Sequence, residues 1–236
     1  MPQPRKLHDR YFKQAKEEGY VARSAYKLLE INEKRRLVRA GDRVLDLGSA
    51  PGSWLQVLDE RLGPRGRITG IDLQEVDAPR SERVRVLRGD AFLTSPEVLL
   101  GAWGEPDPPR FDVVLSDMAP NTTGHGDDFL SARLCERVLD LCAGVLRPGG
   151  NLIMKILEGE PTPGVIARTK RLFIQAGTTK PAASRDLSRE IFIWGTGYVG
   201  ERGNAGPASA TGAREERGAG DGAGRDGGGA RGRPRR

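Results

Sequence analysis

Cysteine and histidine are scarce in this 236-residue sequence, with two residues of each. Cys135 and Cys142 are seven positions apart in a segment with helical periodicity. They therefore share one face, which predicts a buried, reduced pair, because a metal ion would need more ligands than two cysteines. His8 and His125 lie far apart in polar surroundings and form no ligand pattern. We therefore expect no structural metal ion.

Long hydrophobic runs are also missing. No stretch reaches the roughly 18 apolar residues of a membrane span, and the first residues, MPQPRKLHDRYFKQ, lack the apolar centre of a signal peptide. We therefore expect a cytoplasmic protein with no membrane partner, and a monomer. The length is sufficient for one sizeable domain with some residues left over.

Positive charge is concentrated at the two ends of the chain. Residues 1–40 carry eleven Lys and Arg against five Asp and Glu, and residues 201–236 carry eight Arg against five acidic residues. The net charge of the whole chain is +6, so the middle of the chain is slightly acidic. Basic flanks on such a domain favour a polyanionic partner, most commonly nucleic acid, over mere surface solvation.

The chain divides into three regions. Residues 1–40 form a basic N-terminal segment with two predicted helices, separated near Gly19, the second running from about Arg23 to Lys34. Residues 41–200 form the main domain. Residues 201–236 contain eleven glycines and almost no large apolar side chain. This composition predicts a disordered Gly/Arg-rich tail, which either binds RNA loosely or keeps the protein in solution.

The main domain alternates between strand-like and helix-like patterns. The clearest helical stretch is DDFLSARLCERVLDLCAGVLRPGG, residues 127–150, which stops at its Pro-Gly-Gly end. It has an apolar stripe that we predict to face the core: Leu130, Leu134, Val138, Leu141 and Val145. The predicted strands are residues 44–47, 67–72, 83–87, 111–117, 151–156 and 191–199. This alternation indicates an α/β fold with a mostly parallel sheet and helices on both faces. Ligands of such sheets bind outside the carboxyl ends of the strands.

A glycine-rich turn, DLGSAPG at residues 46–52, follows the first predicted strand. It is not the G-x-G-x-x-G sequence that binds dinucleotides. Asp46 suits an ammonium group better than a phosphate, and S-adenosylmethionine has both an ammonium and a cationic sulfonium group. Asp72 ends the next strand, where carboxylates commonly bind ribose hydroxyls, and Asp90 follows the third strand, where it can meet an adenine amino group. Three acids at successive strand ends therefore predict an S-adenosylmethionine site, the alternative being acids that cap loops and helices.

Five segments, in unbroken order over residues 8–200, closely resemble the FtsJ-like ribosomal RNA 2′-O-methyltransferases. They are DRYFKQAKEEGYVARSAYKLLEI, VLDLGSAPGSW, LSDMAPN, IMKI and SREIFI. The resemblance implies a Rossmann-like methyltransferase fold with a seven-stranded sheet. It also implies methyl transfer from S-adenosylmethionine to a ribose 2′-hydroxyl. The tail after residue 200 lies outside the family pattern.

The resemblance also implies the site residues. The Lys-Asp-Lys-Glu tetrad of the family matches Lys27, Asp117, Lys155 and Glu190. The cofactor contacts of the family match Gly52, Trp54, Asp72, Asp90 and Asp117, to which the turn itself adds Asp46 and Gly48. Two serines depart from the usual pattern, since Ser49 and Ser53 stand where the family often has alanine and glycine.

The tetrad also makes physical sense in the predicted topology. Asp117 and Lys155 end the fourth and fifth strands, and Glu190 begins a last strand whose start lies at the same edge if that strand is antiparallel. Lys27 must fold over from the N-terminal helix. A lysine inside the apolar NLIMKI sequence is costly unless it is paired or functional. A ribose hydroxyl must be aligned and must lose its proton. Lys155 is therefore the candidate proton acceptor, or a charged group that orients the hydroxyl, and both roles stay open.

Other activities fit less well. A 5-methylcytosine enzyme often has a nucleophilic cysteine after a proline, but Pro120 is followed by Asn121. An adenine amino-methyltransferase would have an Asn/Asp-Pro-Pro-aromatic turn, which the sequence of residues 117–120, DMAP, does not match. Two alternatives remain: methylation of transfer RNA, and a ribosome-assembly factor whose binding matters more than its catalysis.

The expected substrate follows from the short layout of the chain. This layout resembles the bacterial branch of the family, which methylates a uridine in the A loop of 23S rRNA within assembled or nearly assembled large (50S) subunits. Cations interleaved with aromatic residues in the N-terminal segment predict phosphate contacts and base stacking, although a solvated helix face is the alternative. They are Arg5, Lys6, Arg10, Lys13 and Lys16, with Tyr11 and Phe12.

Overall fold

The structure is a computed structural model that describes residues 5–121, 126–184 and 188–200, with side chains described from residue 10 onward. The chain separates into two units, residues 1–203 and 204–236, and the described residues all belong to the first. The predicted disordered tail, His125 and the side chain of His8 lie outside the described residues. None of the described helices is long and apolar enough to cross a membrane.

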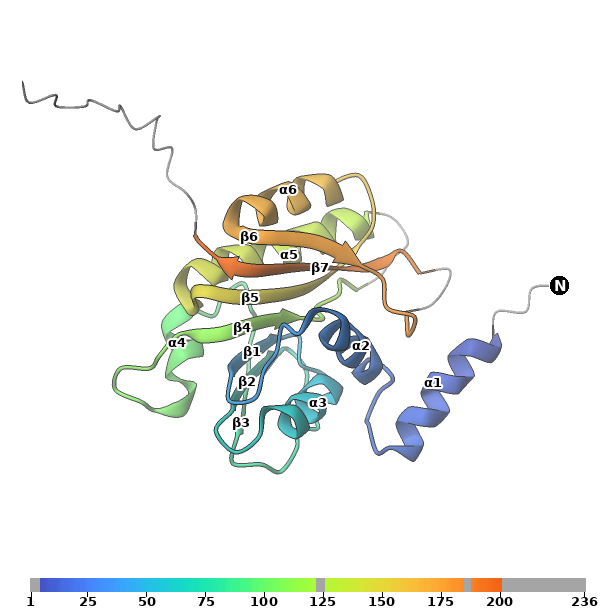
Figure 1. Cartoon of the computed structure of the whole chain (residues 1–236), viewed down its shortest axis with the longest axis horizontal. Helices are drawn as coiled ribbons and strands as arrows, with labels where there is room; N and C mark the ends of the chain where they lie inside the picture. Colours follow the sequence, from blue (N-terminus) through green and yellow to red (C-terminus); the bar gives the residue numbers. More distant parts are fainter. Residues whose placement is uncertain (1–4, 122–125, 185–187, 201–236) are drawn as a thin grey trace, which may run out of the picture. The chain divides into compact units, whose positions relative to one another are not determined.

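Helices and strands alternate along the described chain (Figure 1). The helices are α1 (Arg5–Glu17), α2 (Ala25–Arg35), α3 (Ser53–Leu62), α4 (Pro96–Leu100), the short 3-10 helix η1 (Gly101–Trp103), α5 (Asp127–Val145) and α6 (Thr162–Leu172). The strands are β1 (Arg43–Leu47), β2 (Arg67–Asp72), β3 (Val84–Arg88), β4 (Phe111–Ser116), β5 (Leu146–Leu157), β6 (Phe173–Thr179) and β7 (Glu190–Tyr198). Each of the six predicted strands is present to within a few residues.

The seven strands form one sheet in the order β3-β2-β1-β4-β5-β7-β6. Strands β1 to β5 pair in parallel, and β7 is antiparallel to both β5 and β6. This confirms the predicted α/β fold and the antiparallel last strand. The chain order reverses between β1 and β4, so a ligand crevice is expected at the carboxyl ends of these two strands.

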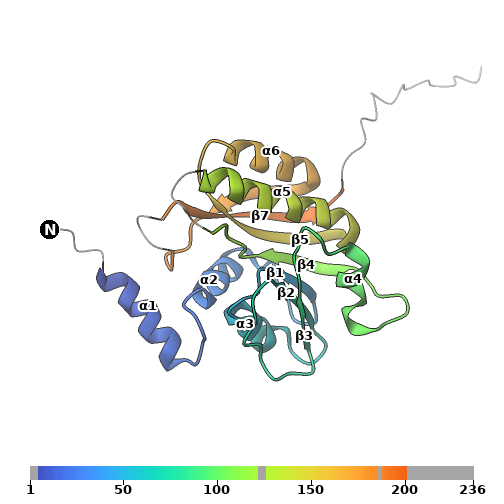
Figure 2. The same cartoon turned by 180° about the vertical axis from the view of Figure 1, so that it is seen from behind.

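Helices cover both faces of the sheet, with α5 and α6 on one face and α2 and α3 on the other (Figures 1 and 2). A separate hydrophobic core fills each side. Along β5, Met154 and Ile156 belong to the core under α5, whereas Ile153 belongs to the core under α2. Because side chains alternate along a strand, Lys155 is directed to the same side as Ile153, toward α2.

Strand β6 has no counterpart in the strands predicted from the sequence pattern. It lies at the edge of the sheet and pairs only with β7 among the described strands. Ile174 in this strand is 69% exposed, and only Phe173 at its start is buried. An edge strand that buries so little apolar surface leaves a weak hydrophobic pattern, which explains why the sequence did not reveal it.

The predicted core stripe of α5 is wrong in its first two turns. Val138, Leu141 and Val145 are buried as predicted, but Leu130 is 44% exposed and Leu134 lines a pocket instead of the core. The reason is that the first turns of α5 lie beside the carboxyl end of β5. There the Ser131 hydroxyl accepts a hydrogen bond from the backbone N–H of Leu157. Cys135 and Cys142 are both buried and free, as predicted.

Helix α2 is packed against segments from both ends of the domain. The Tyr26 ring contacts the rings of Tyr11 and Tyr20, with centroid separations of 5.5 and 5.8 Å. On its other side, Ala183, from the connection between β6 and β7, packs in the same cluster. The backbone N–H of Ala182, in the same connection, donates a hydrogen bond of 2.7 Å to the Glu30 carboxylate on α2. These contacts hold α2 beside the carboxyl edge of the sheet, so Lys27 on α2 can reach it.

Candidate active site

Two glycines allow the turn after β1 to pack tightly. Gly48 has a φ of +81°, and a side chain there would place its Cβ 2.7 Å from the Cγ of Met118. Gly52 has a φ of +117°, and a Cβ there would collide with the carbonyl oxygen of Asp77. Both positions thus require glycine for backbone conformation and for space. The turn therefore lies directly against the chain that leaves β4.

A pocket of about 450 Å³ lies at this point, on the carboxyl edge of the sheet. Its lining includes five of the predicted site residues: Gly48, Asp72, Asp90, Asp117 and Lys155. It also includes residues that the sequence reasoning missed, among them Leu73, Gln74, Phe92, Met118, Asn121 and Leu134. Leu73 and Phe92 closely follow the predicted acids at strand ends, and this position could have predicted that they line the pocket. The sequence did not indicate this for Leu134, because helical periodicity assigned it to the core.

Backbone amides hold two of the pocket acids in place. Asp72 accepts hydrogen bonds from the backbone N–H of Ala50 at 2.9 Å and of Gln74 at 2.8 Å, one on each carboxylate oxygen. Asp90 accepts one from the backbone N–H of Phe92 at 2.8 Å. A carboxylate oxygen can accept more than one hydrogen bond. Both carboxylates are thus oriented by the protein and retain acceptor capacity toward the pocket.

Asp46 lies next to this pocket but is not part of its lining. It is fully buried in β1, and neither carboxylate oxygen has a hydrogen-bond partner among the described residues. Burial, and then the nearby charges of Asp117 and Asp72, raise the pKa of Asp46 well above its ordinary value. Such an unpartnered buried acid is costly in its charged form, unless a cation comes to it.

This environment predicts a pH-dependent gain in stability from Asp46→Asn. Because the folded pKa exceeds the unfolded value of about 3.9, the free energy of unfolding falls as the pH rises through the interval between them. Asparagine is neutral throughout and avoids this loss. We expect Asp46→Asn to raise the free energy of unfolding at pH 8 and to change it little near pH 4. Denaturant unfolding without ligand measures both values.

The control for this experiment is Asp107→Asn, on an exposed loop residue, which should be neutral at both pH values. Equal destabilisation by Asp46→Asn at pH 4 and pH 8 would show that the Asp46 carboxylate is not the destabilising group.

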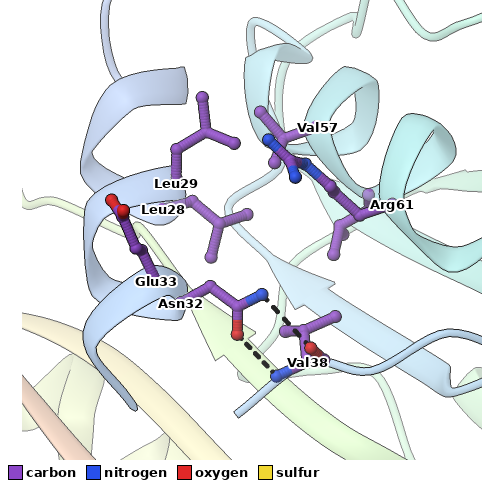
Figure 3. Close-up of a pocket in the computed structure, with 8 residues that line it drawn as sticks. Leu28, Leu29, Asn32, Glu33, Val38, Val57 and Arg61 are labelled. Carbon is purple, nitrogen blue, oxygen red and sulfur yellow. Dashed lines mark hydrogen bonds between the residues drawn. The ribbon is translucent and has the colours of Figure 1, made fainter. Parts of the chain in front are cut away.

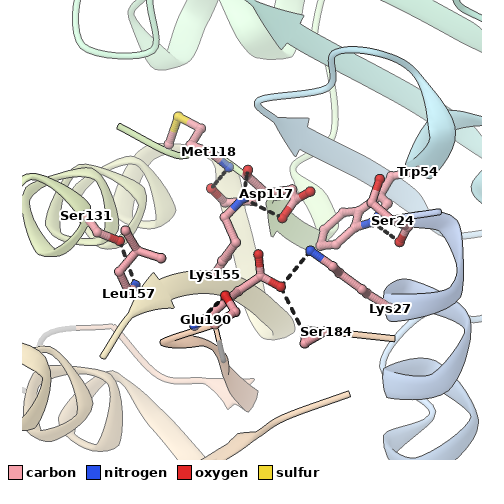
Figure 4. Close-up of polar contacts among 12 residues, drawn as sticks. Ser24, Lys27, Trp54, Asp117, Met118, Ser131, Lys155, Leu157, Ser184 and Glu190 are labelled. Carbon is pink, nitrogen blue, oxygen red and sulfur yellow. Dashed lines mark hydrogen bonds and ion pairs between the residues drawn. The ribbon is translucent and has the colours of Figure 1, made fainter. Parts of the chain in front are cut away.

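The four tetrad residues come together as two ion pairs, each between a buried lysine and a partly buried carboxylate (Figure 4). Lys27 Nζ lies 2.6 Å from Glu190 Oε1, and Lys155 Nζ lies 2.9 Å from Asp117 Oδ1. Lys155 also donates a hydrogen bond of 2.6 Å to the backbone carbonyl of Asp117. The side chains of the two lysines are 9% and 8% exposed. The structure thus brings all four predicted residues to one place, with Lys155 and Asp117 facing the pocket.

The Glu190 carboxylate has a second partner, which the sequence reasoning missed. The hydroxyl of Ser184, in the connection before β7, lies 3.0 Å from Glu190 Oε1. Burial alone would raise the pKa of Glu190, but the ammonium of Lys27, with that of Lys155 and the Ser184 hydroxyl, holds it below its ordinary value. Glu190 is therefore ionised at neutral pH and keeps Lys27 fixed. Nothing in the local sequence pattern around Ser184 indicated this contact.

Like Asp46, two other predicted cofactor residues do not line the pocket. Gly52 is buried at the start of α3, and the Trp54 side chain packs in the core on the α2 side of the sheet, 2% exposed. The predicted contact between Trp54 and the cofactor can therefore involve only its backbone N–H, because its indole points into the core and away from the pocket.

A second cavity of about 320 Å³ lies between α2 and α3 (Figure 3). Its walls are largely aliphatic, and the side chain of Asn32 is bonded to the backbone N–H and carbonyl of Val38. It contains none of the tetrad. Among the described residues, no group of three or more His, Cys, Asp or Glu is arranged to hold a metal ion.

A seven-stranded sheet with an antiparallel β7, and an acid-lined pocket where the strand order reverses, define the chain as a Rossmann-like methyltransferase. The sequence model of the FtsJ-like methyltransferase family matches residues 20–198. The chain belongs to this family.

Relatives with the name "Ribosomal RNA large subunit methyltransferase E" are similar over most of the chain. That of Syntrophobacter fumaroxidans is 44% identical over 191 residues, which cover 80% of this chain and 95% of the relative. That of Methanothermobacter thermautotrophicus is 41% identical over 204 residues, covering 84% and 94%. A crystal structure described as a ribosomal RNA methyltransferase of Plasmodium falciparum superposes with a TM-score of 0.67 at 26% identity. It covers 77% of this chain and all of that one.

Proposed function

We propose that this protein transfers a methyl group from S-adenosylmethionine to a ribose 2′-hydroxyl in RNA. The target is a uridine in the A loop of 23S rRNA, in large ribosomal subunits of the cytoplasm. The observation that carries the proposal is the Lys155–Asp117 ion pair at the edge of an acid-lined pocket. The names of the relatives support the large-subunit substrate.

The pocket fits the proposed cofactor in size and in chemistry. Its volume of about 450 Å³ is typical of small-molecule sites. Asp72 retains acceptor capacity for ribose hydroxyls, and Asp90 for an adenine amino group. The unpartnered Asp46, buried next to the pocket and outside its lining, would favour the ammonium group through its negative charge when ionised. The backbone N–H of Trp54, at the start of α3, suits the cofactor carboxylate, because helix N-termini favour anions. Gly48 and Gly52 let the turn pack against Met118 and Asp77, which fixes the position of the turn beside the pocket.

The residues of the tetrad would handle the ribose. S-adenosylmethionine supplies an electrophilic methyl group when it is bound. Lys155 Nζ would contact the target hydroxyl in one of two forms. As a neutral amine it takes the hydroxyl proton and becomes an ammonium; as an ammonium held by Asp117 it orients the hydroxyl oxygen. The Lys27–Glu190 pair lies beside the Lys155–Asp117 pair, outside the pocket lining, and adds no net charge to the site. Such positioning and proton handling typically contribute about 10²–10⁴-fold.

Asp72→Ala is expected to weaken cofactor binding. The ribose hydroxyls would lose their acceptor, and the Ala50 and Gln74 amides would lose the carboxylate that fixes the walls of the pocket. We expect a binding free energy near −8 kcal/mol for the wild type, the value of a micromolar site, and a dissociation constant about tenfold higher or more in the variant. Calorimetry with S-adenosylmethionine measures both. Heat with NAD and none with S-adenosylmethionine would refute the cofactor assignment.

The N-terminal helix offers a surface for RNA. Arg10 and Lys16 are exposed, and Phe12 is 63% exposed, whereas Tyr11 packs against Tyr26 and is used for folding. Exposed cations and an exposed ring suit phosphate contacts and base stacking. The predicted contributions of Arg5 and Lys6 concern side chains outside the described residues.

A surface variant, Arg10→Ala with Phe12→Ala and Lys16→Ala, is expected to raise KM for large subunits about tenfold or more, with cofactor affinity unchanged. Each lost phosphate contact should also lower the salt slope of binding by about 0.7–0.9. Deletion of residues 201–236 serves as the comparison and should weaken binding only modestly. Methyl transfer to large subunits at several salt concentrations tests both variants. If deletion of residues 201–236 abolished activity and the surface variant behaved as the wild type, the RNA-binding surface would lie in the tail and not on the N-terminal helix.

The deciding experiment for the function is to map methylated riboses in a strain that lacks the gene. A single missing 2′-O-methyl group in 23S rRNA is expected. A missing group in transfer RNA would favour the alternative substrate. Complementation with Lys155→Ala separates catalysis from assembly: restored ribosome assembly without methylation would favour the role of an assembly factor.

A further inference from the structure

The indole of Trp54 contacts the segment that carries Lys27. Its Nε1–H donates a hydrogen bond of 2.9 Å to the carbonyl oxygen of Ser24, the residue directly before α2. That same carbonyl accepts a hydrogen bond of 3.1 Å from the backbone N–H of Lys27. Figure 4 shows the indole beside Ser24 and Lys27. Trp54 thus fixes the turn from which the Lys27 side chain leaves.

The indole ring also supports the other end of the Lys27 side chain. The Trp54 ring packs against the ring of Phe192, with 6.0 Å between centroids. Lys27 Nζ lies over that Phe192 ring, 5.8 Å from its centroid. A cation over an aromatic face is electrostatically favoured. Trp54 therefore holds both the backbone of Lys27 and the ring under its ammonium group.

A neighbouring contact joins the same two segments. The hydroxyls of Ser24 and Ser53 lie 2.6 Å apart, and Ser53 directly follows the glycine-rich turn. The start of α3 is therefore linked to the start of α2 by two hydrogen bonds. Lysine has four rotatable side-chain bonds and is not held by its own geometry, so its placement depends on such contacts.

We infer that Trp54 is a positioning residue for Lys27: its indole, which does not line the cofactor pocket, holds the Lys27 ammonium against Glu190. The catalytic consequence of this inference rests on the proposed function. The placement of Lys27 does not, and it can be measured separately.

The matched pair of variants is Trp54→Phe and Trp194→Phe. Each removes one indole N–H and the same volume. The Trp194 indole N–H is buried but has no hydrogen-bond partner among the described residues, and Trp194 lies on β7 two positions after Phe192. The control therefore reproduces the loss of packing without the loss of the bond to Ser24.

The first measurement is the rate at which acetic anhydride acetylates Lys27, followed by mass spectrometry. An ammonium held at 2.6 Å from Glu190 and only 9% exposed should react slowly. We expect Trp54→Phe to raise this rate about fivefold or more, and Trp194→Phe to leave it within twofold of the wild type. An unchanged rate in Trp54→Phe would overturn the inference, whatever the activity of the protein.

The second measurement is methyl transfer to large subunits, with cofactor affinity determined alongside. We expect Trp54→Phe to lower kcat about five- to tenfold, as for one lost hydrogen bond, with cofactor affinity within twofold. In a Lys27→Met background the same substitution should have almost no further effect, because interacting residues are not additive. A drop in cofactor affinity equal to the drop in activity would instead assign the indole to the cofactor pocket. A wild type that methylates nothing would refute the proposed function and leave the acetylation result standing.

Discussion

Lys155→Met retains S-adenosylmethionine binding and loses about 10²–10⁴-fold of its methyl-transfer rate, the range for a positioned acid-base group. Methionine keeps the apolar volume of a side chain that is 8% exposed, and it removes only the ammonium. The target hydroxyl then has neither an ammonium to orient its oxygen nor a neutral lysine amine to take its proton. Single-turnover transfer of a radiolabelled methyl group to large ribosomal subunits, with calorimetry of cofactor binding, gives both quantities.

Lys180→Met is the matched control, because Lys180 is exposed and its ammonium donates only to the carbonyl of Ser188 among the described contacts. It should behave as the wild type. Near-normal turnover in Lys155→Met would show that Lys155 has no role in the reaction. It would also refute the proposed role of the Lys155–Asp117 pair.

Asp117→Asn is expected to reduce both the reaction and the binding of the cofactor. Asp117 lines the pocket and also pairs with Lys155 at 2.9 Å, so we expect its carboxylate to serve both Lys155 and the proposed cofactor. We expect a loss of about 10²–10³-fold in methyl transfer and about tenfold in cofactor affinity, or 1.4 kcal/mol. The weakened binding distinguishes this variant from Lys155→Met.

The control for this substitution is Asp112→Asn, on the same strand. Asp112 lies toward the opposite end of β4 and pairs with Arg147 at 2.6 Å. It should cost some stability and leave cofactor affinity unchanged. Unaltered cofactor binding in Asp117→Asn, with activity lost, would restrict Asp117 to holding Lys155.

Much of the fold was already determined by local sequence patterns. Strands β1 and β4 are short apolar runs between turn residues, and they are buried because parallel strands are covered on both faces. Gly48 and Gly52 mark a tight turn, because a side chain at either position would collide with a neighbouring segment. Edge strand β6 was missed for the opposite reason: it buries too little to leave a pattern.

The acids at the strand ends were also predictable. Asp72 and Asp90 end or follow parallel strands, whose carboxyl ends meet at one edge of the sheet whatever the side-chain details. The structure places both in one pocket. Lys155 was conspicuous as a lysine in an apolar strand, where an unpaired ammonium is costly.

The sequence by itself thus determined the sheet, the turn and the edge on which the site lies, since these follow from hydrophobic period, glycine geometry and strand direction. Only the tertiary structure decided which charges pair, because Lys27 and Glu190 lie at opposite ends of the domain sequence and meet only when α2 folds beside β7. It also decided the orientation of Trp54, whose indole could have faced the pocket and instead faces Ser24. Side-chain direction at the start of a helix depends on what packs against it, and no periodicity along one chain segment contains that information.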